Sequence, residues 1–190
     1  TTGSITLNTA NVALSGTVAD IKSAFAGTVT THTGTLEISD ANTTDITATD
    51  ITTINTSNTG TITVANTIDI NGSGSEVQAA FAAIDTNTGN ATANITGTDY
   101  TVAQLKAINN ATTGAIVLAT STSEALSGDA TNLADALAGT INYTGNVTVT
   151  DNAYTVAELV AINAGTTGSI TLNTANVALS GTVADIKSAF

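Results

Sequence analysis

Oxygen-bearing side chains gather in one stretch of this sequence, which reads Asp69-Ile70-Asn71-Gly72-Ser73-Gly74-Ser75-Glu76. Carboxylates and amides at alternate positions around glycines are groups that calcium accepts as ligands. The stretch lacks the full Asp-x-Asn-x-Asp-Gly pattern and departs from the Gly-Gly-x-Gly-x-Asp nonapeptide of calcium-binding β-rolls. We therefore favour a solvated turn that caps a helix, and keep Asp69, Asn71 and Glu76 as candidate calcium ligands.

The chain carries one imidazole, that of His32, and no cysteine. A zinc site built from His and Cys and a Cys–His catalytic pair are therefore excluded within it. Ser73-Gly74-Ser75 lacks the lysine of a phosphate-binding loop, and no arginine is present to bind an acidic substrate. We expect His32 to be an exposed turn residue, and we expect no catalytic residue, no cofactor-binding residue and no enzyme activity.

The composition of the chain excludes some classes of binding partner. The 190 residues have a formal net charge of −12, so nucleic acids and anionic membrane surfaces would be repelled. The chain has no Cys, Met, Trp or Pro, but 42% of its residues are hydrophobic, which is enough to bury a thin core. No run of about 18 apolar residues predicts a membrane-spanning helix, so we expect no direct membrane insertion by this segment.

The elements that position these groups follow a short phrase, Thr-Gly-x-Φ-x-Φ, in which Φ is apolar. It occurs seven times, starting at Thr2, Thr33, Thr59, Thr88, Thr113, Thr144 and Thr167. An apolar residue at every second position predicts a strand with one buried face, and the glycine predicts a tight corner before it. The inward residues would be Ile5, Leu7, Leu36, Ile38, Ile62, Val64, Ile116, Leu118, Val147, Val149, Ile170 and Leu172.

The outward positions between them include Thr63, Thr148 and Thr171. They predict a ladder of β-branched side chains that stabilises the sheet. An ice-binding face would need Thr-x-Thr in most coils, and within the phrases only Thr61 and Thr63 supply that pair. We therefore prefer the stabilising ladder.

The phrase belongs to a longer period. Residues 1–25 recur letter for letter as residues 166–190, an offset of 165 residues. We expect the chain to be a window on a much longer array, a single continuous segment over residues 1–190 with repeats at about 3–59, 60–113 and 114–167 and a partial copy at 168–190. One strand per coil at a near-constant spacing is typical of solenoids.

Short helices are expected between the strands. Val18, Ile21 and Phe25 have helical spacing after Thr17, a plausible N-cap, and similar patterns recur around Val77–Phe81 and Leu133–Leu137. The stretches Asp99–Ile108 and Ala153–Ile162 lie 54 residues apart and also predict helix. The related stretch Asp45–Ile54 is rich in Thr, which has poor helix propensity, so we expect it to be irregular or extended.

A family resemblance rests on the sequence Ala153-Tyr154-Thr155-Val156-Ala157-Glu158-Leu159-Val160-Ala161-Ile162-Asn163 and on Gly165-Thr166-Thr167-Gly168-Ser169-Ile170-Thr171-Leu172. This resembles the Thr/Ala/Asn-rich tandem repeats of very large bacterial cell-surface proteins, notably from marine cyanobacteria and proteobacteria. The similarity spans the chain but is compositional and marks no catalytic residue. It implies secretion, great length and a structural or adhesive role.

Together these patterns predict a right-handed β-solenoid with short helices (an α/β-solenoid), with one parallel strand per coil of about 27 residues. The expected function is that of a structural repeat segment in a very long extracellular fibre or surface-layer protein, associating with itself. The alternative is a calcium-dependent adhesin or binding module of a secreted repeat protein. No other cofactor is expected.

Overall fold

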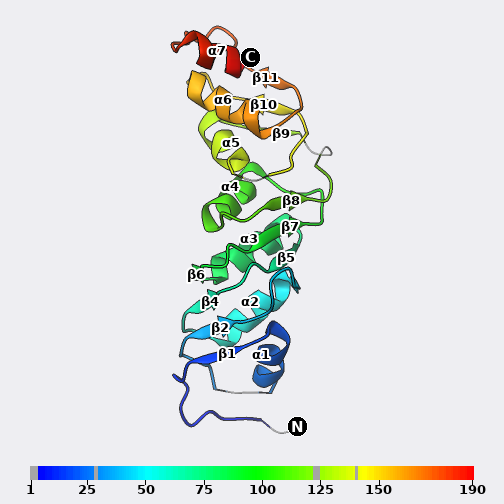
Figure 1. The fold of residues 1–190 in the computed structure, drawn as a ribbon, viewed down its shortest axis with the longest axis vertical. Helices are drawn as coiled ribbons and strands as arrows, with labels where there is room; N and C mark the ends of the chain where they lie inside the picture. Colours follow the sequence, from blue (N-terminus) through cyan, green and yellow to red (C-terminus); the bar gives the residue numbers. More distant parts are fainter. Residues whose placement is uncertain (1–3, 28–29, 122–124, 140) are drawn as a thin grey trace.

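The computed structural model describes residues 4–27, 30–121, 125–139 and 141–190. This part forms an elongated stack of α/β units with the two ends of the chain at opposite ends of the stack (Figure 1). Its helices are α1 Val18–Phe25, α2 Ala48–Ser57, α3 Gly74–Ala83, α4 Val102–Ala111, α5 Ala130–Leu137, α6 Val156–Gly165 and α7 Val183–Ala189. We define a unit as one helix together with the segment that leads into it.

Most helices begin at a residue that the sequence marks as a cap. Thr17 accepts a hydrogen bond from the backbone N–H of Asp20 at the start of α1. Ser73, Thr101 and Thr155 start α3, α4 and α6 in reciprocal capping boxes, in which the third helical residue bonds back to the cap. The helices predicted after Thr17, around Val77 and Leu133, and within both later stretches of the 54-residue pattern are thus confirmed.

Helix α2 was not expected. The prediction of irregular or extended structure over Asp45–Ile54 is wrong, because the chain forms strand β3 over Asp45–Thr47 and helix α2 from Ala48 onward. Ala48, Ile51 and Ile54 are buried on one side of α2, which packs between α1 and α3. Burial of this apolar stripe outweighs the low helix propensity of the threonines.

The strands form three separate parallel sheets. The first has the order β1-β2-β4-β6, the second β3-β5-β7-β8 and the third β11-β10-β9. Strands of the first sheet are β1 Leu14–Gly16, β2 Leu36–Ile38, β4 Ile62–Val64 and β6 Thr86–Asn87. Those of the second are β3 Asp45–Thr47, β5 Asp69–Gly72, β7 Thr92–Ile95 and β8 Ile116–Leu118, and those of the third are β9 Leu126–Gly128, β10 Val147–Val149 and β11 Ile170–Leu172.

The predicted β-solenoid with one strand per coil is therefore wrong. The described part is a mixed α/β protein with seven helices and three small parallel sheets of four, four and three strands. Four of the described helices follow two strands instead of one: β2–β3 precede α2, β4–β5 precede α3, β6–β7 precede α4 and β8–β9 precede α5. The phrase strands are divided among the sheets, β2 and β4 in the first, β7 and β8 in the second, and β10 and β11 in the third.

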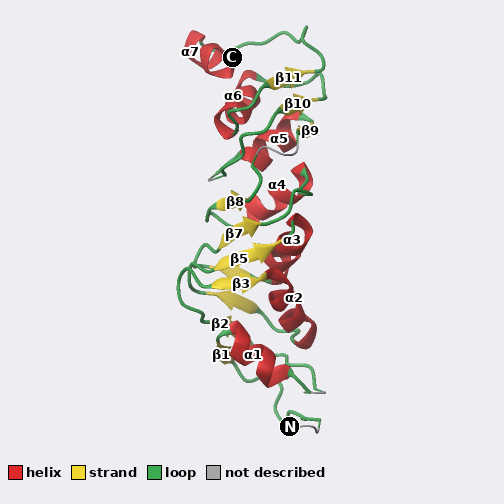
Figure 2. Cartoon of the chain, turned by 90° about the vertical axis from the view of Figure 1, so that its right-hand side faces the viewer, coloured by secondary structure: helices red, strands yellow, loops and turns green. Residues whose placement is uncertain are grey.

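Helix packing gives a physical reason for the broken sheets. Every consecutive pair of helices from α1 to α7 is in contact, so each unit stacks its helix on the helix of the next. Packed helices lie about 8 to 10 Å apart whereas paired strands lie about 4.8 Å apart. This difference in spacing is a physical reason for several small sheets in place of one continuous sheet. In Figure 2 helices α2, α3 and α4 lie to the right of β3, β5, β7 and β8, whereas α6 and α7 lie to the left of β10 and β11 near the top of the stack.

The core lies between the helices and the sheets. Eight of the twelve residues predicted to point inward are buried, and they are Leu36, Ile38, Ile62, Val64, Ile116, Leu118, Val147 and Val149. The other four belong to the terminal units: Leu7, Ile170 and Leu172 are half-buried and Ile5 is exposed. Inward alternation in the strands is confirmed in the middle of the stack, while the end units lack a neighbour on one side.

The phrase glycines are required by close stacking. A Cβ on Gly34, Gly60, Gly89, Gly114 or Gly168 would lie within 3.0 Å of backbone atoms in the preceding unit. None of these has the positive φ that we expected of a strained corner; in the described part the glycines with positive φ are Gly27 and Gly139. The backbones of neighbouring units meet at these glycines, which leaves no room for a side chain.

Candidate functional site

The position two residues before each phrase glycine from Gly34 to Gly168 carries a polar side chain that is buried or half-buried. His32, Asn58, Thr112 and Thr166 account for four of the five buried polar or charged residues in the described part. Tyr143, before Gly145, is also buried, and Asn87, before Gly89, is half-buried. These six residues, which we call the polar column, run along the stack at the joints between units.

His32 shows how a member of the polar column works. Its Nδ1 lies 2.7 Å from Oδ1 of Asn58 in the following unit, and its Nε2 lies 2.8 Å from the carbonyl oxygen of Val12 in the preceding unit. Its ring also contacts that of Phe25 at 5.7 Å between centroids. The prediction that His32 is an exposed turn residue is wrong, because its side chain bridges three successive units and is 1% exposed.

Thr112 and Thr166 repeat one contact 54 residues apart. The Thr112 hydroxyl donates a hydrogen bond to the carbonyl of Ala91 at 2.7 Å and accepts one from the N–H of Gly114 at 3.0 Å. The Thr166 hydroxyl likewise donates to the carbonyl of Gly145 and accepts from the N–H of Gly168. Each hydroxyl therefore accepts one hydrogen bond from the backbone of its own phrase and donates one to the backbone of the preceding unit.

Side-chain hydrogen bonds to backbone carbonyls also join consecutive helices. Asn109 in α4 donates through Nδ2 to the carbonyl of Asp135 in α5, and Asn163 in α6 donates to the carbonyl of Ser188 in α7. The two asparagines are 54 residues apart. The 54-residue pattern in the sequence thus corresponds to a repeated set of contacts between neighbouring helices.

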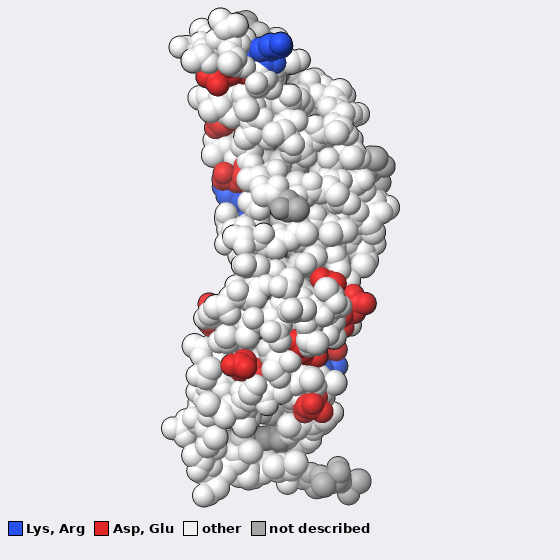
Figure 3. All heavy atoms as spheres, viewed as in Figure 1, with Lys and Arg blue, Asp and Glu red and all other residues white. Residues whose placement is uncertain are grey.

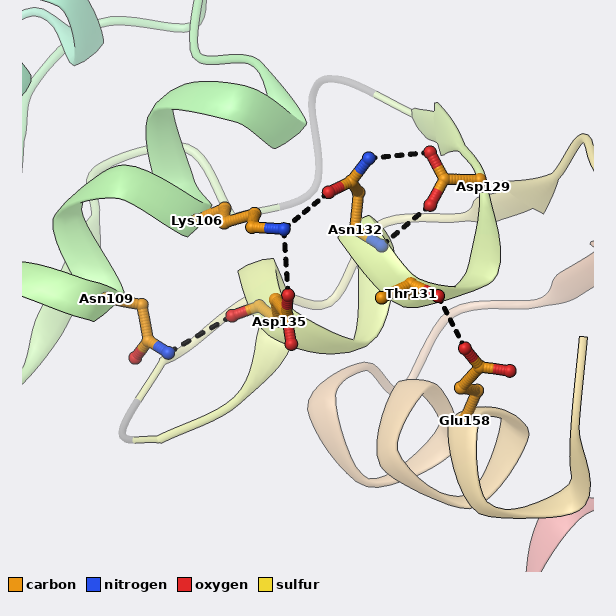
Figure 4. Close-up of polar contacts among 7 residues, drawn as sticks. All are labelled: Lys106, Asn109, Asp129, Thr131, Asn132, Asp135 and Glu158. Atoms are coloured by element: carbon orange, nitrogen blue, oxygen red, sulfur yellow. Dashed lines mark hydrogen bonds and ion pairs between the residues drawn. The ribbon is translucent and has the colours of Figure 1, made fainter.

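A network of charged and polar side chains links α4, α5 and α6 (Figure 4). Lys106 in α4 donates to Oδ1 of Asn132 at 2.6 Å and forms an ion pair with Asp135 at 2.9 Å, both in α5. Asn132 in turn bonds through its backbone N–H and its side chain to Asp129, the N-cap of α5. A shallow depression of about 450 Å³ beside Lys106 and Asn132 accompanies this network. The network's polar groups are directed at one another and hold adjacent helices in register.

Three carboxylates at helix starts have altered acidity. Hydrogen bonds from the backbone and side chain of Asn132 lower the pKa of Asp129. The hydrogen bond from the Thr131 hydroxyl, followed by those from Thr155, lowers the pKa of Glu158. The backbone N–H and hydroxyl of Ser73 lower the pKa of Glu76 in the same way. Each carboxylate is stabilised in its charged form by groups that need an acceptor.

Two of the three candidate calcium ligands, Glu76 and Asn71, have hydrogen-bond partners within the fold. Glu76 accepts hydrogen bonds from the backbone N–H and the hydroxyl of Ser73 in the capping box of α3. Asn71 lies two residues after Asp69 in strand β5 and donates to Oδ1 of Asp45 in the neighbouring strand β3, at 3.0 Å. Among the residues that the structure describes, no group of three or more His, Cys, Asp or Glu side chains lies close enough to hold a metal ion.

Acidic side chains are scattered along the visible face, with few lysines among them (Figure 3). Lys22 in α1 forms an ion pair with Asp50 in α2, beside a depression of about 470 Å³ that Asp40 and Asp45 also line. Asp40 is buried and accepts a hydrogen bond from the backbone N–H of Val18 at 2.8 Å. This ion pair and this hydrogen bond link α1 in the first unit to the second unit.

The sequence contains a signal for the polar column that single-residue inspection misses. Aligning the seven phrases on their glycines places seven residues at one position: Thr1, His32, Asn58, Asn87, Thr112, Tyr143 and Thr166. A position that is polar in so many copies, directly before a strand, predicts a repeated structural hydrogen bond. Reading His32 alone, without its equivalents, led to the exposed turn.

No family model, curated protein or solved structure matches this chain. The longest helices in the described ranges have ten residues, for example α4 and α6, and none is long and apolar enough to cross a membrane. The geometry of the stack and the internal repeats of the sequence are the features that bear on function.

Proposed function

We propose that this chain is a structural repeat segment of a very long extracellular fibre or surface-layer protein, with a mechanical, scaffolding role. The observation that carries the proposal is the exact recurrence of residues 1–25 as 166–190. The first copy forms the unit of α1 at one end of the stack and the second forms the unit of α7 at the other (Figure 1). A further period can therefore follow on the same architecture.

The contacts between units support extension. Side-chain hydrogen bonds that join units span 17 to 28 residues, from Tyr143 to Leu126 at the short end and from Lys22 to Asp50 at the long end. A molecule in which each unit contacts only its neighbours gains length at nearly constant stability per added unit. Length and mechanical continuity follow from this property, and neither requires a binding site for a small molecule.

The composition supports persistence outside the cell. The chain has no Cys or Met to oxidise, and its three basic residues are Lys22, Lys106 and Lys187. A net charge of −12 keeps parallel fibres apart at low salt and permits their association through bridging cations.

Imaging of the native material tests this function. Antibodies against this chain should label the surface of intact cells, and negative-stain images should show unbranched fibres or a coat with a repeat tied to the 165-residue period. Discrete compact particles inside the cell, with no rod or sheet, would refute the proposal.

A further inference from the structure

Both ring nitrogens of His32 face oxygen atoms that accept hydrogen bonds. Nδ1 lies 2.7 Å from Oδ1 of Asn58, and Nε2 lies 2.8 Å from the carbonyl oxygen of Val12. A neutral imidazole has one N–H donor and one lone pair, so it can donate only one of these two hydrogen bonds. The imidazolium ion has two N–H donors and can donate both.

The orientation of the Asn58 amide is fixed by a second residue. Its Nδ2 donates to the carbonyl of Gly60 at 2.6 Å, and its Oδ1 accepts from the N–H of Gly60 at 3.3 Å. Turning the amide over would place oxygen against that carbonyl and nitrogen against that N–H, so two hydrogen bonds would be lost. The amide therefore presents its oxygen to His32, and the carbonyl of Val12 can only accept.

The surroundings of the ring favour its charged form. His32 is 1% exposed, so water does not supply a missing partner, and a charge at this depth is tolerated only where its donors are hydrogen-bonded. The ring centroid of Phe25 lies 5.7 Å from that of His32. An aromatic ring attracts a cation that faces it from within about 6 Å.

The charged side chains around this joint are mostly acidic. Helices α1 and α2 and the segment between them carry five acids and one lysine, which are Asp20, Glu37, Asp40, Asp45, Asp50 and Lys22. Lys22 is paired with Asp50, and among the described residues no ion pair joins His32 to any of the six. The remaining acids contribute a negative potential that stabilises a nearby cation.

We propose that His32 is held as an imidazolium ion in the folded chain, and that loss of its proton to solvent at alkaline pH loosens the joint between the first three units. The neutral ring would leave a nitrogen lone pair against an oxygen lone pair in a buried contact. His32 is therefore a pH-sensitive switch within the polar column. This goes beyond the proposed function, because a passive scaffold needs no response to pH.

The direction of the pH effect follows from proton linkage. The folded chain retains one proton that the unfolded chain releases as the pH rises above about 6.5, where histidine ordinarily titrates. The stabilisation by the charged ring is therefore complete below that pH and is lost at higher pH. One proton can raise the unfolding equilibrium constant by at most about tenfold per pH unit.

Nuclear magnetic resonance tests the protonation state directly. Because the chain has a single histidine, the ring signals need no assignment. In the ¹⁵N-labelled full-length chain at about pH 7.5, long-range ¹H–¹⁵N spectra should show both ring nitrogens protonated. The same chain unfolded in urea should show a mostly neutral ring. One protonated and one unprotonated nitrogen in the folded chain would overturn the proposal.

A substitution tests the effect on stability. His32→Gln keeps a side chain that donates and accepts hydrogen bonds but cannot take up a proton. Between about pH 6 and pH 8.5, the unfolding equilibrium constant of the wild type should rise at least about fivefold more than that of His32→Gln. Parallel profiles in urea unfolding would refute the switch. Should His32→Gln fail to fold, amide exchange in the wild type gives the same decision.

Amide exchange localises the effect to one joint. The N–H of Thr59 donates to the carbonyl of His32, and the N–H of Thr144 donates to Ser121 at the equivalent joint, where Tyr143 replaces histidine. Protection of the Thr59 amide, corrected for the intrinsic exchange rate, should fall between about pH 6 and pH 8.5, while that of Thr144 should not. Equal changes at both amides would overturn the proposal and leave the proposed function standing.

Discussion

The hydroxyl of Thr112 satisfies two backbone groups in different units, the carbonyl of Ala91 and the N–H of Gly114. Thr113, the next residue, is exposed. Thr112 and Thr113 have the same side chain but different surroundings. Substituting each in turn therefore distinguishes the contribution of the polar column to stability from the general effect of replacing a threonine.

We expect Thr112→Val to lower the free energy of unfolding by about 1 to 2 kcal/mol, because it leaves the buried carbonyl of Ala91 and the partly buried N–H of Gly114 without their partner. Thr113→Val is the matched control and should change stability by less than about 0.5 kcal/mol. Urea unfolding followed by circular dichroism measures both. Equal effects of the two substitutions would mean that the polar column contributes nothing.

Gly60 allows a test of close stacking. An alanine Cβ there would overlap the carbonyl groups of Thr33 and Gly34 in the preceding unit, so Gly60→Ala should destabilise the chain by about 2 kcal/mol or more. Gly128 is the control, because its nearest neighbours to a new Cβ, on Leu133 and Val102, lie at 3.8 and 3.9 Å. Gly128→Ala should be neutral or slightly stabilising in the same assay. A harmless Gly60→Ala would contradict the close approach of the backbones.

Helices α3 and α6 start in capping boxes that use Glu76 and Glu158, whereas α4 uses Gln104 in the same place. The folded chain lowers the pKa of both glutamates and of Asp129. A carboxyl with a lowered folded pKa binds protons less readily in the folded state than in the unfolded state. Its stabilisation is therefore complete above the ordinary pKa of 4.5 for Glu or 3.8 for Asp, and is lost as the pH falls through the folded pKa.

We accordingly expect the free energy of unfolding to decline as the pH falls below about 4.5. Glu158→Gln should make that decline shallower, since an amide caps without titrating. Gln104→Glu should make it steeper, because it adds a titrating cap to α4. Urea titrations between about pH 6 and pH 2.5 would show this; parallel profiles for all three proteins would exclude the helix caps as the cause.

Local signals in the sequence predicted most helices but not the sheets. Helix starts can be predicted locally because an N-cap side chain interacts only with the next three residues. The caps of this kind are Thr17, Ser73, Thr101 and Thr155. Strand pairing depends on the spacing between stacked units, which helix packing sets and which no local pattern contains. The buried stripe of α2 and the buried ring of His32 were missed for the same reason, since both depend on neighbours about 26 residues away.

We expect the stack to be stable without calcium. Two of the candidate ligands have hydrogen-bond partners, Asn71 with Asp45 and Glu76 with Ser73, and the third, Asp69, lies in strand β5. The melting temperature should therefore be the same with excess calcium and with excess chelator, within about 1 °C. A shift of many degrees would favour the calcium-dependent adhesin, since a ligand that binds only the folded state raises its stability.

Two-period chains test the central claim, that units stack on their neighbours alone and can be continued without limit. Small-angle X-ray scattering would compare the 190-residue chain with a chain in which residues 1–165 occur twice before residues 166–190, and with one in which they occur three times. We predict that the maximum dimension increases by the same increment with each added period, while the cross-sectional radius stays constant. A cross-section that grows, or a profile of flexibly linked compact bodies, would contradict the claim.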